Sequence, residues 1–232
     1  MPMPVDFHSH ILPGIDDGSA CVEESLKMLR LEWQQGIRHV VATPHFYPRE
    51  DTPDAFLLRR ERAARSLEGF ADIPAITLGA EVYFFRGMSQ SDALQKLTIG
   101  KSRYILIEMP PAPWSEDLYR ELEAIRTLQG LTPVIAHIDR YIGPLRTYGI
   151  PERLAQLPVL VQANGEFFLE RPTAALALRL LKGDKIHLLG SDCHDLTHRP
   201  PNLGDAVQRI RRKLGPEALD KIRAYEDQIL CV

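Results

Sequence analysis

The chain has 232 residues, of which 44% are hydrophobic and 25% are charged, enough apolar material for a core of ordinary size. This composition argues against a disordered protein, a collagen and a disulfide scaffold. Because 28 Lys and Arg residues face 31 Asp and Glu residues, the net charge is −3 and the basic excess typical of nucleic-acid binding is missing. We therefore expect no nucleic-acid partner.

Short apolar runs alternate with longer amphipathic stretches along the chain. The runs rich in Val, Ile and Leu predict seven strands, at Val5–His8, His39–Thr43, Ala75–Gly79, Tyr104–Ile107, Pro133–Ala136, Val159–Ala163 and His187–Gly190. The amphipathic stretches predict helices at Val22–Gln35, Ala55–Leu67, Glu116–Gln129, Pro151–Gln156, Thr173–Lys182, Leu203–Leu214 and Pro216–Leu230. Ser115 and Pro216 stand where helix starts favour them.

Strands that are apolar throughout and separated by helices predict a parallel sheet covered by those helices, either a barrel or a doubly wound sheet. The length favours one barrel, and neither a flexible linker nor an internal repeat divides the chain. We therefore predict an α/β fold of the TIM-barrel type, formed by residues 1–232 as one domain.

The three cysteines, Cys21, Cys193 and Cys231, include no C-x-x-C pair and are expected to be reduced thiols of a cytoplasmic protein. The N-terminus lacks the basic and apolar regions of a signal peptide. No uncharged run approaches the roughly 18 residues that a membrane span needs, so we expect no membrane insertion.

Polar side chains follow every predicted strand, at the end where active sites of parallel α/β folds collect. A single histidine there is more often structural than metal-binding. Many imidazoles and carboxylates at one barrel mouth are costly to bury unless cations compensate them. The predicted metal ligands are His8, His10, Asp17, His45, Glu81, Glu108, His137, Asp192 and His194.

Nine such ligands are too many for one ion, because a zinc-like ion takes three or four protein ligands. The number predicts three ions that share a bridging carboxylate. Imidazole and carboxylate ligands without thiolate suit Mn, Fe or Zn, and we favour Mn.

Two arginines follow strand ends that also carry predicted ligands. Arg140 comes three residues after His137, and Arg199 comes five after His194. An arginine is by default a surface residue, but paired guanidinium groups beside metals are what a phosphate group requires. The pattern therefore favours hydrolysis of phosphate esters.

A competing motif runs from Cys193 to Arg199, with the C-x-x-x-x-x-R spacing of cysteine-dependent tyrosine phosphatases. It would predict a thiolate that attacks phosphorus. The loop contains no glycine, and Pro200 and Pro201 after it have no N–H groups to offer a phosphate. We therefore expect Cys193 to be a buried apolar residue of the barrel wall.

With these residues in place, the sequence resembles the PHP (polymerase and histidinol phosphatase) superfamily, and within it the bacterial capsule-type phosphotyrosine phosphatases. The most specific match is the run His8-Ser9-His10-Ile11-Leu12-Pro13-Gly14-Ile15-Asp16-Asp17-Gly18, preceded by Asp6. Shorter matches follow in order: Thr43-Pro44-His45, Gly79-Ala80-Glu81, Ile107-Glu108, His137-x-x-Arg140-Tyr141, Asn164-Gly165 and Ser191-Asp192-x-His194.

The resemblance implies a distorted (β/α)7 barrel that holds three metals. The implied ligand sets are His8, His10, Glu81 and Asp192 for the first metal, Glu81, Glu108 and His137 for the second, and Asp17, His45 and His194 for the third. It places the phosphate-binding arginines at Arg140 and Arg199, with Asp192 also catalytic. Phe46 and Ile138-Asp139 depart from the pattern of the family, outside the ligand positions.

The implied activity is hydrolysis of phosphotyrosine by a metal-activated hydroxide. The implied substrate is the tail of an autophosphorylated bacterial tyrosine kinase that regulates capsule or exopolysaccharide synthesis, and a homo-oligomer is possible. A phosphatase of histidinol phosphate or another small phosphomonoester would use a similar site. An amidohydrolase is disfavoured because Glu108, and not a lysine, ends its strand. A non-catalytic metal-binding accessory protein is a further alternative.

Overall fold

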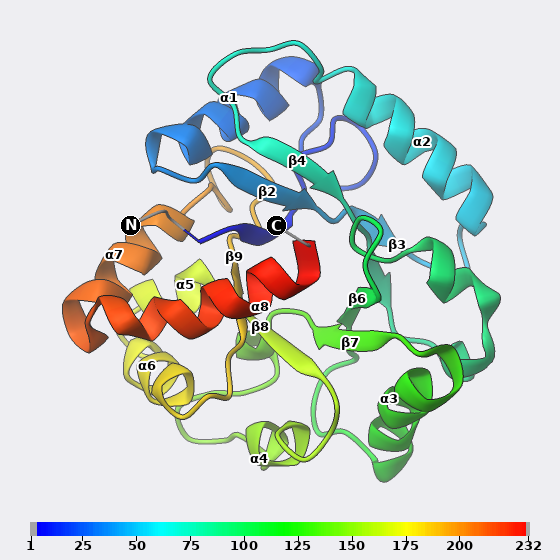
Figure 1. Ribbon diagram of the computed structural model, residues 1–232, viewed down its shortest axis with the longest axis vertical. Helices are drawn as coiled ribbons and strands as arrows, with labels where there is room; N and C mark the ends of the chain where they lie inside the picture. The colour runs from blue at the N-terminus through cyan, green and yellow to red at the C-terminus, as the bar shows by residue number, and fades with distance from the viewer. Residues whose placement is uncertain (1–3, 231–232) are drawn as a thin grey trace.

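The computed structural model describes residues 4–230, so Cys231 lies outside the described residues. Helices surround a ring of strands in it (Figure 1). The strands are β1 (Asp6–Ser9), β2 (His39–Ala42), β3 (His45–Phe46), β4 (Ala75–Leu78), β5 (Glu81–Tyr83), β6 (Tyr104–Glu108), β7 (Thr132–Ile135), β8 (Leu160–Asn164) and β9 (Leu188–Gly190). The α-helices are α1 (Val22–Gln34), α2 (Pro53–Arg65), α3 (Glu116–Gln129), α4 (Ile150–Leu154), α5 (Gly165–Leu169), α6 (Ala174–Lys182), α7 (Leu203–Leu214) and α8 (Asp220–Leu230).

All paired strands are parallel and form two sheets, ordered β1-β2-β4 and β3-β5-β6-β7-β8-β9. β3 continues β2 after two residues, and β5 continues β4 after two residues, so the ring has the seven predicted strand positions. A bridge between Ser9 and Cys193 joins β1 to the end of β9. The predicted α/β barrel is thus confirmed, with its wall split between two sheets.

The two interruptions lie side by side in the barrel wall. The residues between β2 and β3 are Thr43 and Pro44, and those between β4 and β5 are Gly79 and Ala80. Pro44 has no N–H to give to the ladder, but its carbonyl accepts the Glu81 N–H at 3.0 Å. Ala42 pairs with Leu78 before the interruption and His45 pairs with Glu81 after it, so the ladder resumes in the same register.

Several predicted helix boundaries are wrong by a few residues. α2 begins at Pro53 because the Thr52 hydroxyl accepts the Ala55 N–H, whereas the predicted cap Ser115 makes no side-chain capping bond to α3. The predicted last helix divides into a 3-10 turn over Pro216–Leu219 and α8. The short helix α5 and the 3-10 turns at Met88–Gln90, Asp92–Lys96 and Ile138–Arg140 were not predicted.

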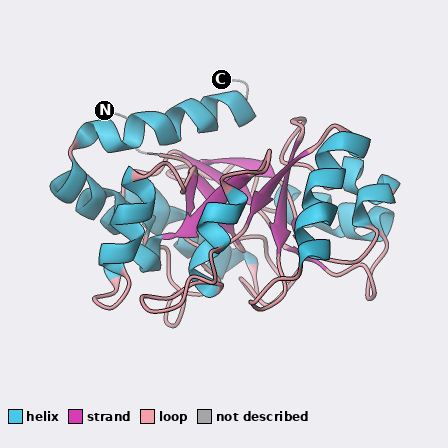
Figure 2. Cartoon of the chain, turned by 90° about the horizontal axis from the view of Figure 1, so that it is seen from below, coloured by secondary structure: helices cyan, strands magenta, loops and turns pink. Residues whose placement is uncertain are grey.

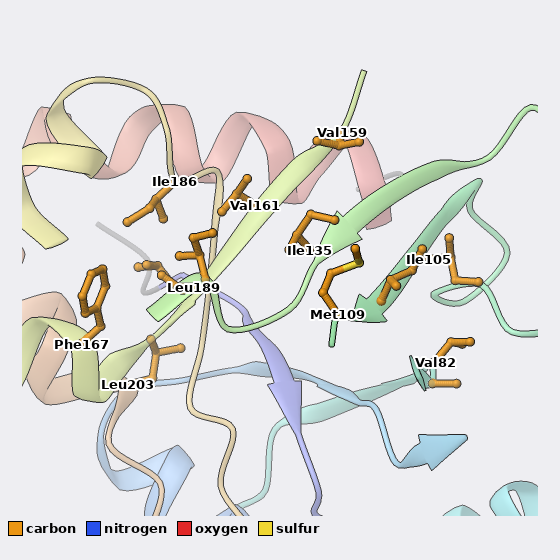
Figure 3. Close-up of a cluster of buried hydrophobic side chains, with 14 of the residues drawn as sticks. Val82, Ile105, Met109, Ile135, Val159, Val161, Phe167, Ile186, Leu189 and Leu203 are labelled. Carbon is orange, nitrogen blue, oxygen red and sulfur yellow. The ribbon is translucent and has the colours of Figure 1, made fainter. Parts of the chain in front are cut away.

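Side chains alternate between two apolar clusters, as period-two strands require. On β6, Ile105 and Ile107 face outward into the larger cluster beneath the helices, to which the residues labelled in Figure 3 belong. Tyr104 and Leu106 of the same strand face a smaller cluster inside the barrel. Glu108 continues this inward row, so the row changes from apolar to acidic toward the strand end.

α8 lies across one end of the barrel, and long loops extend from the other end (Figure 2). Ile229 of α8 packs into the inner apolar cluster, and the Val5 N–H donates to the Glu226 carboxyl at 3.0 Å. The end of the barrel near the strand starts is therefore plugged, which leaves the opposite mouth for the site. Over residues 4–230, none of the helices has the length and apolar character needed to cross a membrane.

Candidate metal centre

The nine predicted metal ligands come together at the mouth of the barrel, at or just after the carboxyl ends of the strand positions. Their side chains are buried or half-buried except that of Asp17, which is 69% exposed. His137 and Asp192 adopt positive φ values of 30° and 54°. Left-handed backbone at residues other than glycine is strained and clusters at functional sites.

Three side-chain atoms converge on one point, and a fourth lies beside them. His8 Nε2 and His10 Nε2 are 3.1 Å apart, and they lie 3.2 and 3.3 Å from Glu81 Oε2. Each is also 3.5 Å from Asp192 Oδ1. Metal–ligand bonds of about 2.0–2.1 Å separate tetrahedral ligands by about 3.3–3.4 Å. His8, His10 and Glu81 therefore have the spacing of ligands around one ion, and Asp192 stands beside the two histidines.

Glu81 lies between two further histidines. Its Oε1 is 2.7 Å from His137 Nε2, and its Oε2 is 3.0 Å from His45 Nδ1. Glu108 faces the same pair, with oxygens 3.7 Å from His137 Nε2 and 3.9 Å from His45 Nδ1. The two oxygens of Glu81 thus contact different groups of ligands, as a bridging carboxylate would.

The third group centres on the exposed carboxylate of Asp17. Its Oδ1 lies 3.5 Å from both His45 Nε2 and His194 Nε2. The rings of His10 and His194 are 3.9 Å apart, and a donor atom of His10 lies within 4.8 Å of the other three. His10 therefore joins two groups, whereas the resemblance assigned it to the first only.

Within residues 4–230, several buried donor atoms of this centre have no hydrogen bond. They are His45 Nδ1, Glu81 Oε2, His137 Nδ1, Asp192 Oδ1 and His194 Nε2. A buried polar atom without a partner costs free energy, and here nitrogen and oxygen atoms free of thiolate gather in one place. The residues present therefore fit divalent transition metals of the Mn, Fe or Zn type.

The protonation of the centre follows from its charges. Although burial opposes ionisation of Glu81, the charge of His8 and hydrogen bonds from His10 hold the pKa of that carboxyl well below its usual range. Burial, with the charge of His10, lowers the pKa of His194 to about 4. Burial opposes protonation of His8 and His10, but the nearby carboxylates raise the pKa of both imidazoles. Because metals bind neutral imidazoles, metal binding would displace protons from these two rings.

The two predicted phosphate-binding arginines meet on one carboxylate. Arg140 Nη2 lies 2.5 Å and Arg199 Nη2 lies 2.6 Å from Asp192 Oδ2. Their side chains are 38% and 35% exposed, and both line a cavity of about 140 Å³ that also reaches Asp192 and Asn164. Each guanidinium group therefore keeps donors for a ligand in the cavity.

Three further polar residues position the predicted ligands. None of the three is among the predicted site residues. Asp16 Oδ2 lies 2.7 Å from His10 Nδ1 and accepts the His45 N–H. Gln162 contacts His8 Nδ1 at 3.2 Å and accepts the His137 N–H at 2.6 Å, and Asn164 donates to Asp192 Oδ2. A polar Gln162 inside the apolar run Val159–Ala163 was the available signal.

Cys193 is fully buried, as predicted, and its backbone helps to join β9 to β1. Burial and the nearby carboxylates of Asp6 and Glu32 raise the pKa of the Cys193 thiol well above its ordinary value. A nucleophilic thiolate needs a lowered pKa and access to substrate. The structure therefore excludes the mechanism suggested by the C-x-x-x-x-x-R motif.

The remaining histidines lie away from the nine predicted ligands. His39 Nε2 lies 2.7 Å from Thr77 Oγ1 on the neighbouring strand, and His187 Nδ1 accepts the Val161 N–H. His198 is exposed at the rim of the cavity beside Arg199. None of the three joins the groups of possible metal ligands found in residues 4–230.

A parallel barrel with imidazoles and carboxylates at its mouth and two arginines beside them defines a metal-dependent hydrolase of the PHP type. The sequence model of the CpsB/CapC family, described as capsular polysaccharide synthesis, matches residues 4–230. The chain therefore belongs to that family. The chain is 34% identical to the tyrosine-protein phosphatase CpsB of Streptococcus pneumoniae, over 91% of each chain. It is 31% identical to the tyrosine-protein phosphatase YwqE of Bacillus subtilis strain 168, covering 92% of this chain and 86% of that one. The predicted family resemblance is confirmed.

Solved structures agree on the fold. A structure reported with YwqE of Bacillus subtilis and CpsB of Streptococcus pneumoniae, described as unique metal-dependent tyrosine phosphatases, matches with a TM-score of 0.84 and 24% identity, over 98% of this chain and 94% of that one. A dihydropyrimidinase from Brevibacillus agri matches with a TM-score of 0.54 and 12% identity, over 95% of this chain and 66% of that one. At these identities the matches establish the barrel architecture.

Proposed function

We propose that the chain is a metal-dependent phosphotyrosine-protein phosphatase whose barrel acts as one domain. The observation that carries this proposal is the convergence of His8, His10 and Glu81 at 3.1–3.3 Å. Asp192 lies 3.5 Å from both histidines and contacts two arginines. The names of the relatives support the same activity, since CpsB and YwqE are tyrosine-protein phosphatases.

The donor groups support binding of divalent metals, and we assign three ions to them, with Mn as the favoured element. His8, His10, Glu81 and Asp192 would hold the first, Glu81, Glu108 and His137 the second, and Asp17, His45 and His194 the third. When bound, such cations polarise a phosphoryl group and ionise water near neutral pH.

The chain's own residues would bind and orient the phosphate. Arg140 and Arg199 have donors left over after contacting Asp192, and these would bind the non-bridging phosphate oxygens. Asp192 holds both guanidinium groups at the edge of the centre, and Asn164 donates a hydrogen bond to the same Asp192 oxygen. The arginines are therefore aligned before substrate arrives, which reduces the free energy needed to order them.

We assign the substrate to a phosphotyrosine protein, and propose the tail of a bacterial tyrosine kinase that controls capsule or exopolysaccharide synthesis. The CpsB/CapC family belongs by description to capsular polysaccharide synthesis, which supports this pathway. Assembly into homo-oligomers and a cytoplasmic location stay predictions.

The test is hydrolysis of a phosphotyrosine peptide compared with histidinol phosphate, before and after treatment with a chelator. We expect preference for the peptide, loss of activity on chelation, recovery with Mn²⁺ and no effect of thiol alkylation. Activity that resists chelation but is lost on alkylation would contradict the proposal, and a preference for histidinol phosphate would favour the small-substrate alternative.

A second measurement addresses the assigned residues. Asp192→Ala should remove a predicted metal ligand and release both arginines, so we expect kcat/KM to fall by at least about a hundredfold. Asp54→Ala, an exposed carboxylate paired with Lys96 on the surface, is the matched control. Full activity of Asp192→Ala would support a non-catalytic or differently built site.

A further inference from the structure

Two tyrosines stand one layer above the predicted metal ligands. His45 of β3 pairs in register with Glu81 of β5, and Tyr83 of β5 pairs with Glu108 of β6. Tyr47 directly follows β3, two residues after His45, and Tyr83 ends β5, two residues after Glu81. Since side chains of extended backbone alternate, each tyrosine is expected on the inward face. Two residues along a strand span about 6.6 Å, so both tyrosines lie on the inner wall nearer the mouth.

Ring contacts confirm this placement. The Tyr47 ring stacks on the His45 imidazole, with centroids 5.2 Å apart and planes 28° apart. The rings of Tyr47 and Tyr83 are 5.8 Å apart. The three rings therefore form a continuous aromatic surface from the metal centre toward solvent.

Neither tyrosine has an evident structural role that requires its hydroxyl. Both side chains are half-buried, and within the described part of the chain no hydrogen bond to either hydroxyl is formed. Tyr141, by contrast, is buried and its hydroxyl accepts the Met109 N–H at 2.8 Å. Tyr47 and Tyr83 thus present ring faces at the mouth rather than satisfying the polar interior.

We propose that Tyr47 and Tyr83 form an aromatic wall that packs against the phenyl ring of phosphotyrosine and selects aryl over alkyl phosphate esters. This inference rests on the proposed function. A phosphate bound at the metal centre would place the ring of its tyrosine one ester link further out, toward the layer that holds the two tyrosines. Stacked or edge-on aromatic pairs contribute about 0.5–1.5 kcal/mol beyond the area they bury. A serine phosphate has no ring to make that contact.

The experiment compares two peptides of identical sequence, one with phosphotyrosine and one with phosphoserine, on the Mn²⁺-loaded protein. For Tyr47→Leu we expect KM for the phosphotyrosine peptide to rise about three- to tenfold with kcat largely retained. Kinetic constants for the phosphoserine peptide and inhibition by inorganic phosphate should not change. Tyr47→Phe keeps the ring and should behave as the wild type.

Tyr225→Leu is the matched control, because it makes the same chemical change on α8 at the opposite end of the barrel. Tyr83→Leu is the second variant. It replaces Tyr47→Leu in the test if metal content or circular dichroism shows that Tyr47→Leu no longer binds metal or no longer folds. It should show the same selective rise in KM.

Three outcomes would overturn the inference. A tyrosine-over-serine preference unchanged in both leucine variants would show that the wall contributes no selectivity. Equal losses on both peptides, with weaker inhibition by inorganic phosphate, would show that Tyr47 only supports His45. A wild-type protein inactive on phosphotyrosine would overturn the proposed function itself, whereas the first two outcomes leave that function intact.

Discussion

At the scale of single residues, Asp16 shows how one carboxylate fixes two parts of the centre. It contacts the His10 ring on the side away from the converging donor atoms, and it accepts the backbone N–H of His45 and of Gly18. Burial alone would raise its pKa, but the hydrogen bond and charge of His10 outweigh burial and lower the pKa of Asp16 to about 2. It is therefore an ionised orienting group at pH values well above 2.

We predict that Asp16→Asn weakens metal binding by about ten- to a hundredfold, the usual cost of losing a group that orients a ligand. The amide loses the charge that aligns the His10 ring. Titration of the metal-free protein with Mn²⁺ measures the effect, with Asp54→Asn as a surface control of equal charge change. Unchanged Mn²⁺ affinity would show that Asp16 only stabilises the backbone through its hydrogen bonds with Gly18 and His45.

Gly190 is a second decisive residue because β9 approaches β1 too closely for a side chain. A Cβ at this position would lie 2.6 Å from His8 Cβ and 2.9 Å from His8 N. We predict that Gly190→Ala lowers the free energy of unfolding by about 1–3 kcal/mol, as overpacking does. Gly143→Ala, where a Cβ meets nothing within 4 Å, should cost less than about 0.5 kcal/mol. Urea unfolding of both variants measures the two free energies of unfolding. Equal values for Gly190→Ala and Gly143→Ala would contradict the prediction.

The metal ligands could be predicted from the sequence, whereas the residues that orient those ligands could not. The positions of His8, Glu81 and Asp192 at strand ends, together with their side-chain chemistry, predicted them as metal ligands. Asp16 and Gln162 could not be assigned that way, because the role of an orienting group depends on contacts between loops and strands far apart in sequence. Asp16 also stands beside Asp17, and only the fold shows that Asp16 contacts His10 whereas Asp17 lies near His45 and His194.

At the scale of elements, α8 carries a buried carboxyl that makes folding stability depend on pH. Burial raises the pKa of Glu226 to about 8, although the Val5 N–H opposes the rise. Between its ordinary value of 4.5 and about 8, the carboxyl is protonated in the folded state and ionised in the unfolded one. The unfolded state then binds fewer protons, so stability is lost as pH rises through this window.

We predict that Glu226→Gln removes that loss, because the amide stays neutral and can still accept the Val5 N–H. Between pH 5 and pH 8 the wild type should lose stability relative to the variant by at most about 1.4 kcal/mol per pH unit. Urea unfolding at several pH values measures the difference, with Asp54→Asn, an exposed carboxylate on α2, as the control. Parallel pH profiles for wild type and Glu226→Gln would contradict it.

The seven strand positions could be predicted from apolar runs, but the splitting of two positions could not. Thr43-Pro44 and Gly79-Ala80 continue the apolar pattern of their strands, and periodicity says nothing about which neighbour a backbone group finds. β3 and β5 are also only two and three residues long, too short to produce a signal of their own. β3 and β5 form because their backbone groups pair with neighbouring strands in the barrel wall.

At the scale of the whole molecule, the predicted metal ligands come from nearly every strand position of the barrel. A cation bound there ties together segments far apart in the sequence and binds only the folded chain. At a metal concentration a hundred times the Kd, one such site adds about 2.7 kcal/mol. For a chain of this size that corresponds to a rise in Tm of about 5–10 °C.

We therefore predict that Mn²⁺ raises the Tm of the chelated wild-type protein by about that amount, as measured by calorimetry. His137→Ala should show a smaller rise, whereas His39→Ala, which removes an imidazole outside the centre, should show the full one. An equal rise in all three proteins would place metal binding elsewhere.

The hydrogen bond between Val5 and Glu226 brings the first strand and the last helix together at the plugged end of the barrel, opposite the mouth (Figure 2). A fusion partner or a solid support attached near either of these segments would sit on the far side from the entrance. A bulky phosphoprotein could then reach an immobilised copy unhindered. The protein is thus suited to display on beads, where a catalytically impaired variant could retain its substrates from solution.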